Sequence, residues 1–212
     1  MNFGDFIIQN RIEIAELTFE HLWIVGISTV LAIVVGIPLG ILITRKPALH
    51  NPVLVTANII QTIPSLALFG FLLPAPWIGE RSGRLAILAL TLYALLPLIR
   101  NTFTGIKGVD HAVIEAARGM GLTDWQMLYK VQLPLAASVI LAGVRVAVVT
   151  SVGLATIAAA IGAGGLGELI FRGLAMVNNA VILAGAVPAA LMALAADALL
   201  GFLERRFAPQ RS

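Results

Sequence analysis

The chain has 212 residues, of which 59% are apolar and only 12% are charged, whereas about a quarter of the residues of an ordinary soluble domain are charged. This balance is typical of a polytopic membrane protein, and we expect a single transmembrane domain over residues 1–212. The net charge is only +3 and the basic residues stand beside apolar runs. They therefore indicate membrane topology, and no nucleic-acid partner is expected. The chain has no cysteine, which excludes disulfides and thiolate metal sites.

Five apolar runs follow one another along the chain, and a membrane-spanning helix needs about 20 residues. The runs cover residues 22–43, 53–73, 85–99, 135–161 and 181–203. The third run is short and is expected to extend by a turn at either end. Acidic residues outnumber Arg11 before the first run, so that run is predicted to be a retained span and not a cleaved signal. The sequence therefore predicts an all-α membrane protein with about five transmembrane helices.

Lysine and arginine are divided unequally between alternate loops, and the richer side of a membrane protein is the cytoplasmic side. One side has Arg45, Lys46, Arg100, Lys107, Arg118, Lys130, Arg205, Arg206 and Arg211, and the other has Arg11, Arg81, Arg84 and Arg172. We therefore predict that the amino terminus lies outside and the carboxyl terminus in the cytoplasm. Residues 100–134 then form a cytoplasmic loop.

Polar side chains interrupt the second run at Asn58, Gln61, Thr62 and Ser65, close to Pro64. They are three to four residues apart, so one side of a helix would carry them. Such a stripe is expected to face the bundle or a water-filled path, because polar groups in lipid are costly. The stripe could line a translocation path, with Pro64 loosening the helix as a gate, or it could hydrogen-bond between helices. Both interpretations stay open.

Two charges lie within later runs, Arg145 in the fourth and Asp197 in the fifth. Both fall in the cytoplasmic half of their spans, so we predict that they pair and stabilise the base of the bundle. Separate extension of each side chain to the interface is the alternative. In the first run, Gly36-x-x-x-Gly40 favours close contact with another helix.

The polar loop at 100–134 has the local signals of two short helices. Asp110 is a plausible N-cap of the first helix, and Gly121 offers a place to end it because glycine accepts the left-handed conformation. Thr123 with Gln126 predicts a capping box that begins the second helix. Pro134 is expected to restrict Leu133 and to mark the return into lipid. The loop is thus predicted to be a rigid helical elbow, although an ordinary connection rich in helix formers would share these signals.

The elbow also contains a spaced motif: Glu115-Ala116-Ala117, three residues, Gly121, nine residues, Val131, one residue, then Leu133-Pro134. This spacing resembles the signature loop of the permease subunits of bacterial ABC importers, with valine where isoleucine is more usual. The resemblance implies that Glu115, Ala116, Ala117, Gly121, Leu133 and Pro134 couple the chain to an ATPase subunit. ATP and Mg would then be bound by that partner, and this chain would be a transport subunit without catalytic residues, metal or cofactor.

Further stretches resemble one branch of that family, the permeases of osmoprotectant importers for glycine betaine, choline, carnitine or related quaternary amines. They are Asn58–Leu68, Tyr93–Pro97, Arg100–Asp110, Ile161–Gly167 and Phe171–Gly173, within a match over residues 15–206. The resemblance implies the type I ABC importer permease fold in a bacterial inner membrane. It also implies a second permease subunit, identical or related, two ATPase subunits, and an external solute-binding protein.

Two other functions are weighed against this one. A permease for another small solute, such as methionine or an alkyl sulfonate, would share the machinery. A pore or secondary transporter would need no ATPase, but it would leave the elbow without a role. The sequence Gly162-x-Gly164-x-x-Gly167 also matches a dinucleotide fingerprint, which requires a preceding strand. Since this sequence follows a predicted span, we interpret it as a tight external bend or gate-lining turn.

Overall fold

The computed structural model describes residues 3–74 and 82–207, and every regular element within them is a helix. The helices are α1 (Phe3–Gln9), α2 (Arg11–Arg45), α3 (Pro47–Thr62), α4 (Ser65–Leu72), α5 (Ser82–Lys107), α6 (His111–Gly119), α7 (Asp124–Met127), the π-helix η1 (Leu128–Gln132), α8 (Leu133–Ala158), the 3₁₀-helix η2 (Ala159–Ile161), α9 (Gly167–Ala175) and α10 (Asn179–Phe207). The predicted all-α class is therefore confirmed for these residues. Arg81 and Arg211, which enter the charge comparison, lie outside them.

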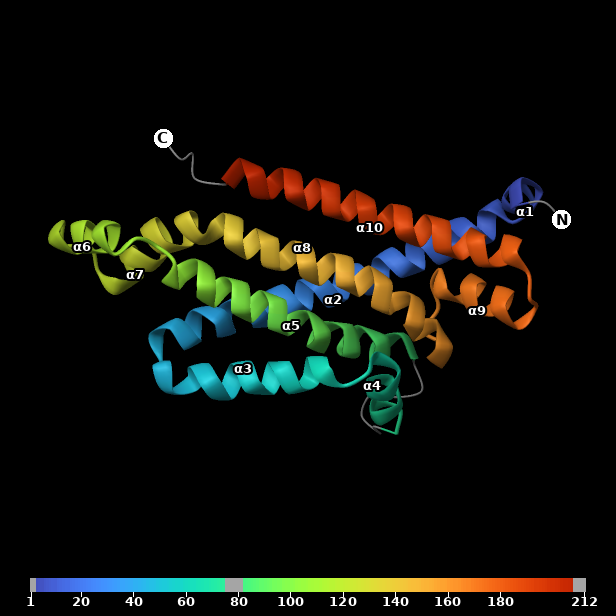
Figure 1. The fold of residues 1–212 in the computed structure, drawn as a ribbon, viewed down its shortest axis with the longest axis horizontal. Helices are drawn as coiled ribbons and strands as arrows, with labels where there is room; N and C mark the ends of the chain where they lie inside the picture. Colours follow the sequence, from blue (N-terminus) through green and yellow to red (C-terminus); the bar gives the residue numbers. More distant parts are fainter. Residues whose placement is uncertain (1–2, 75–81, 208–212) are drawn as a thin grey trace.

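The long helices run side by side along the length of the molecule (Figure 1). Four are long and apolar enough to cross a membrane: α2, α5, the continuous helix Asp124–Ile161 and α10. The bent pair α3–α4 makes a fifth if it is counted as one span, so the prediction of about five spans is confirmed. Helix α1 lies at one end of the bundle, and α10 runs from that end to the other (Figure 1). Helices α6 and α7 lie at the end where α10 finishes.

The second span differs from its prediction, because it is not one straight helix. It begins earlier, at Pro47, and α3 and α4 meet at an angle of 99°. The cause is local: Pro64 has no backbone N–H and disfavours a helical conformation of the residue before it. Ile63 accordingly has an extended backbone, with ψ of 128°. Proline therefore breaks this span and does not merely loosen it.

Glycines bring the helices into close contact. Gly36 and Gly40 of α2 face α5, and a Cβ added at Gly40 would lie 2.5 Å from the Cβ of Thr102. The predicted close contact of this glycine pair is therefore confirmed. A Cβ at Gly143 of α8 would likewise lie 2.7 Å from the Cβ of Asn101 on α5. Small residues let the backbones approach, as is usual where lipid supplies no hydrophobic force between helices.

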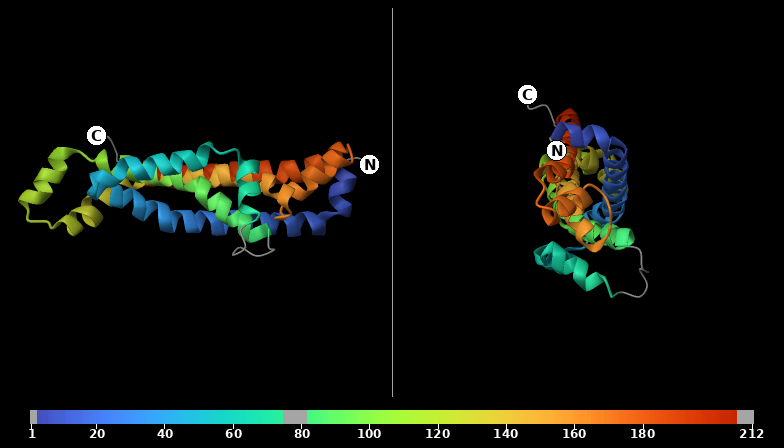
Figure 2. Two further views of the ribbon diagram at one scale, coloured as in Figure 1. Left: turned by 90° about the horizontal axis from the view of Figure 1, so that it is seen from below. Right: turned by 90° about the vertical axis from the view of Figure 1, so that its right-hand side faces the viewer.

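The bundle has two different sides. Figure 2 shows α2 along one side and α3 along the other. On α2 the exposed side chains are mostly large and apolar, among them Phe19, Trp23, Val30 and Val34. A face of this kind is suited to contact with lipid acyl chains.

Candidate functional site

The loop predicted at 100–134 is shorter in the structure, because α5 continues to Lys107 and α8 begins at Leu133. The elbow is therefore residues 110–132, and it protrudes beyond the end of the helical bundle (Figure 2). Its local signals formed as predicted. The Asp110 carboxylate accepts the Ala112 N–H at 2.8 Å at the start of α6. The side chains of Thr123 and Gln126 complete a capping box at the start of α7. Gly121, between the helices, has φ of +81°, a conformation that costs a residue with a side chain about 1 kcal/mol.

The motif residues of α6 divide between two faces. Glu115 and Ala116 are exposed, whereas only 2% of Ala117 is accessible. The Glu115 carboxylate lies 3.7 Å from the ring of His111, one turn earlier. The Ala117 carbonyl accepts the N–H of Leu122 at 3.2 Å, which closes the end of the helix onto the bend. The elbow therefore exposes Glu115 on a helix whose opposite face is packed through the buried Ala117.

The second limb of the elbow continues directly into a span. The π-helix η1 follows α7 and leads into α8, so that one helix runs from Asp124 to Ile161. Leu133 is helical, with φ of −65° and ψ of −44°, and the expected restriction of Leu133 by Pro134 is wrong. Pro134 is the second residue of α8 and directly follows the π-helical turn, in which the Leu133 N–H donates to the Leu128 carbonyl. A π-helical turn within a longer helix often marks a functional site.

Arg45, at the end of α2, anchors this limb, and the sequence analysis missed it. Its Nη2 donates to the Asp124 carbonyl at 3.2 Å and to Oε1 of Gln132 at 3.0 Å. The partners are 79 and 87 residues away in the chain, so no local pattern could reveal the contact. Two apolar residues of the elbow, Met120 and Trp125, each have 74% of their surface exposed. Exposed apolar side chains of this kind mark a surface that contacts protein or membrane.

The polar residues of the second span are separated by the break. Asn58 and Thr62 are exposed on α3, Gln61 is half-buried, and Ser65 begins α4 beyond the bend. The four side chains therefore do not form one straight stripe. The Thr62 hydroxyl donates to the carbonyl of Ile59 in its own helix at 2.7 Å.

A tyrosine of the neighbouring span supports the break. The hydroxyl of Tyr93, on α5, donates to the carbonyl of Ile63. This carbonyl lies at the end of α3, where the helix has stopped and supplies no N–H for it. The contact is a second feature that the sequence analysis missed, since Tyr93 entered only as part of a family-like stretch.

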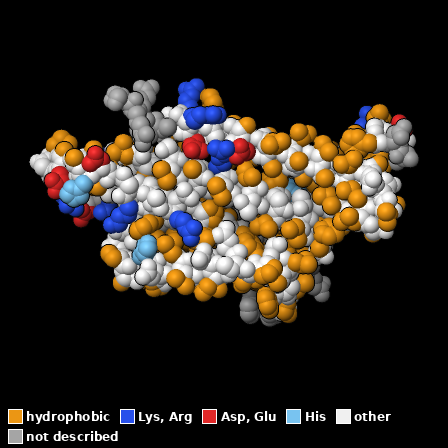
Figure 3. Space-filling view, viewed as in Figure 1, with side chains coloured by type: hydrophobic (Ala, Val, Ile, Leu, Met, Phe, Trp, Pro, Cys, Tyr) orange, Lys and Arg blue, Asp and Glu red, His pale blue; other side chains and the backbone are white. Residues whose placement is uncertain are grey.

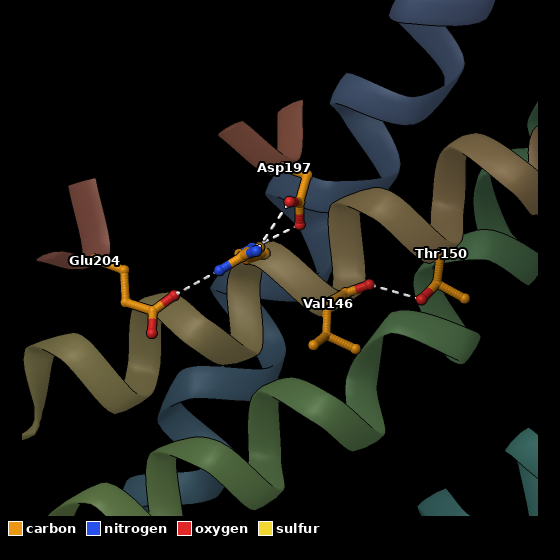
Figure 4. Close-up of polar contacts among 5 residues, drawn as sticks. Val146, Thr150, Asp197 and Glu204 are labelled. Carbon is orange, nitrogen blue, oxygen red and sulfur yellow. Dashed lines mark hydrogen bonds and ion pairs between the residues drawn. The ribbon is translucent and has the colours of Figure 1, made fainter. Parts of the chain in front are cut away.

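The structure brings Arg145 and Asp197 together (Figure 4). Nε and Nη2 of Arg145, on α8, donate to the two carboxylate oxygens of Asp197, on α10, at 2.6 and 2.8 Å. Nη1 donates to Glu204 at 3.3 Å, a partner that the sequence analysis missed although it lies two turns after Asp197 on the same helix. Gly201 makes room for the guanidinium, because a Cβ there would lie 3.1 Å from Nη1.

This ion cluster (Arg145, Asp197 and Glu204) lies at the surface of the single chain (Figure 3). Between 31% and 42% of each side chain is exposed. Charged groups within spans almost always face the interior of an assembly or a water-filled cavity. Thr150 follows Arg145 on α8 and is also exposed; its hydroxyl donates to the carbonyl of Val146 at 2.6 Å (Figure 4). This part of α8 and α10 is therefore unsuited to contact with lipid.

At the end of the bundle opposite the elbow, residues 162–167 form a tight bend. Gly162, Gly164 and Gly165 all have positive φ, between 77° and 84°. The Glu20 carboxylate, on α2, accepts the N–H of Gly165 at 2.9 Å, and a Cβ at Gly164 would lie 2.4 Å from that carboxylate. The bend follows a helix, so it lacks the strand that a dinucleotide fingerprint requires. The interpretation as a tight bend is confirmed.

These features define a class: a helical membrane protein with broken and glycine-packed spans, and a rigid helical elbow held outside the bundle. Residues 36–209 match the model of the family described as the binding-protein-dependent transport system inner membrane component, and the chain belongs to this family. It is thus a multi-pass inner-membrane permease component of an ABC transporter and not its ATPase. The alternative of a pore or secondary transporter is thereby wrong.

Relatives match almost the whole chain. It is 43% identical to the carnitine transport permease protein OpuCB of Listeria monocytogenes, over 97% of this chain and 93% of that one. It is 45% identical to the glycine betaine/carnitine/choline transport system permease protein OpuCD of Bacillus subtilis, over 97% and 89%. It is 44% identical to the osmoprotectant import permease protein OsmW of Salmonella typhimurium, over 97% and 96%.

Solved structures show the same fold. A chain of the MetNI methionine ABC transporter in an inward-facing conformation superposes with a TM-score of 0.81 at 26% identity, over 90% of this chain and 94% of that one. A chain of an amino acid ABC transporter superposes with a TM-score of 0.80 at 17% identity, over 97% and 99%. The expected ABC importer permease fold is therefore confirmed.

Proposed function

We propose that this chain forms the translocation path of an ATP-driven importer for quaternary-amine osmoprotectants, which an external binding protein delivers. The observation that carries the proposal is the identity of 43–45%, over nearly the full chain, with permeases named for carnitine, glycine betaine and choline. Identity with the methionine transporter chain is only 26%. Quaternary amines are therefore favoured over methionine or an alkyl sulfonate as the solute class.

In this proposal the elbow docks on an ATPase subunit, which binds ATP and Mg. Glu115 and Ala116 face outward from α6, and Ala117 fixes the helix from behind. Gly121 sets the bend, while Leu133 and Pro134 begin the span that receives the motion. The rigidity of both limbs supports this role, since a push on a capped helix is transmitted and a push on a mobile loop is dissipated.

The elbow would lie in the cytoplasm, with the carboxyl terminus on the same side and the amino terminus outside. The distribution of lysine and arginine supports this orientation. Two permease subunits would enclose the path, the second being either another copy of this chain or a related chain. The half-exposed ion cluster supports such a partner, because the assembled transporter would then shield charges that a single chain leaves at its surface.

The path itself would pass the side of the bundle away from α2. On α2 the exposed side chains are mostly large and apolar. On α3, Asn58 and Thr62 are exposed beside the apolar Val55 and Ile59, and α8 exposes Thr150. The break at Pro64, with half-buried Gln61 before it and Ser65 after it, would be the movable part of this lining. We propose that Arg145 and Asp197 stabilise the inner base of the bundle.

The test is uptake of labelled glycine betaine, carnitine and choline by cells in which the chain is deleted or restored. A third strain carries Glu115→Arg, and a matched control carries Glu16→Arg, which reverses an exposed acidic residue of α2 far from the elbow. We expect Glu115→Arg to abolish uptake while the chain stays in the membrane, and Glu16→Arg to retain it. Full uptake by Glu115→Arg would refute the docking role. Uptake of all three amines independent of the chain would refute the solute class.

A further inference from the structure

An apolar groove of about 620 Å³ lies between the end of α2 and the second limb of the elbow. Its walls are Pro38, Ile41 and Leu42 of α2, Trp125 and Leu128 of the elbow limb, and Leu133 at the start of α8. The docking motif contributes only Leu133 to it, and none of the residues proposed above to line the translocation path lines the groove. The groove is therefore a separate feature of the fold.

The groove belongs to the side of the bundle that is suited to lipid. Leu42 is 36% exposed, and the exposed residues Val34 and Val35 lie earlier on the same helix. Trp125 is 74% exposed beside the groove, and tryptophan is enriched where a membrane meets water. An acyl chain can thus enter the groove from the surrounding bilayer, whereas a water-soluble ligand would meet almost wholly apolar walls.

One end of the groove carries an arginine side chain. Arg45 lines it and uses Nη2 for both bonds to the elbow. Asp124, an acidic residue that also lines the groove, lies in the first turn of α7, where the helix dipole favours a negative charge. Basic pockets of this kind at the membrane surface bind anionic lipid head groups.

We propose that this groove is a binding site for an anionic phospholipid. One acyl chain lies against Leu42, Leu128 and Leu133, and the phosphate lies at Arg45. The lipid then bridges α2 and the elbow limb at the point where Arg45 already joins them. Its presence would fix the angle between the elbow and the bundle, so transport would depend on the anionic lipid content of the membrane.

The experiment is photo-crosslinking of the complete transporter in lipid nanodiscs. The probe is phosphatidylglycerol with a diazirine in one acyl chain, compared with phosphatidylcholine that carries the same chain. Labelled positions are mapped by mass spectrometry in the parent chain and in Arg45→Gln. The matched control is Lys46→Gln, which removes a neighbouring exposed charge outside the groove. Leu42→Trp, which fills the groove, is a second variant whose charge is unchanged.

We expect phosphatidylglycerol to label residues 38–45 and 125–133 more strongly than phosphatidylcholine does. Arg45→Gln should reduce this preference about fivefold, because the phosphate loses a direct hydrogen bond from the guanidinium. Lys46→Gln should retain it, and Leu42→Trp should lose labelling by both lipids. Equal labelling by the two lipids, or equal losses in the two charge variants, would overturn the proposal. So would labelling that appears only when the ATPase subunits are removed, since the groove would then be covered by protein.

Discussion

Gly40 offers a sharp test of how closely α2 and α5 must approach. In Gly40→Ala the new Cβ would lie 2.5 Å from the Cβ of Thr102 and 3.0 Å from the carbonyl oxygen of Ile99. Ordinary contact begins at 3.4 Å, so the two helices would have to part by about 0.9 Å. Because Thr102 is fully buried and the obstacle is its Cβ, no rotation of the side chain can relieve the clash.

A matched control lies on the same helix. A Cβ at Gly26 meets nothing within 4 Å, so Gly26→Ala changes only the helix propensity, which improves by about 1 kcal/mol. The same gain applies to Gly40→Ala and cancels when the two variants are compared. The remaining difference is the cost of overpacking, about 1–3 kcal/mol. For a chain of this size it corresponds to a melting midpoint roughly 2–12 °C below that of Gly26→Ala.

The assay is the fraction of purified chain that stays monodisperse after heating in detergent. Thr102→Gly removes the opposing Cβ, so the double variant with Gly40→Ala should recover part of the lost stability. If Gly40→Ala melts at or above the temperature of Gly26→Ala, the close approach of the two helices described here is incorrect.

Three further predictions concern the ion cluster, the broken span and the elbow. Asp197→Arg should reduce the amount of assembled transporter on native gels, and adding Arg145→Asp should restore part of it; no recovery would argue against the pair. Tyr93→Phe should lower stability by about 1 kcal/mol, because the carbonyl at the break loses its donor, and an unchanged melting midpoint would show that another group replaces it. Gly121→Ala should lower ATP-dependent uptake at equal membrane content, since the left-handed bend becomes strained by about 1 kcal/mol. Unchanged uptake in Gly121→Ala, set beside Gly119→Ala in the adjoining helix as control, would show that the bend tolerates a side chain.

The features predicted correctly from the sequence are those that neighbouring residues determine. Asp110 and the Thr123–Gln126 box cap their helices through contacts of two or three residues in the chain. The apolar runs predicted the spans because length and composition suffice to cross a bilayer. The Arg145–Asp197 contact could be predicted because both residues lie in the cytoplasmic halves of their predicted spans, and therefore at a similar depth in the membrane.

What was missed depends on contacts between distant segments. Arg45 hydrogen-bonds to the elbow, and Tyr93 hydrogen-bonds to the broken span 30 residues away. Neither contact can be predicted from the residues that adjoin Arg45 or Tyr93 in the sequence. The 99° bend at Pro64 was underestimated because a proline can kink a helix or end it, and the surrounding packing decides which occurs. Glu204 could have been found, since its spacing of seven from Asp197 places both on one helix face.

The continuous helix from Asp124 to Ile161 has a mechanical consequence. Its 38 residues make a rod about 57 Å long, with the elbow limb at one end and the glycine bend that receives Glu20 at the other. A tilt of such a rod by about 5° about its midpoint moves each of its two ends by about 2.5 Å, in opposite directions. A shift of that size away from Glu20 takes the glycine bend out of hydrogen-bonding distance. A small displacement of the elbow would therefore be enough to break the contact between Glu20 and the glycine bend at the opposite end of the bundle.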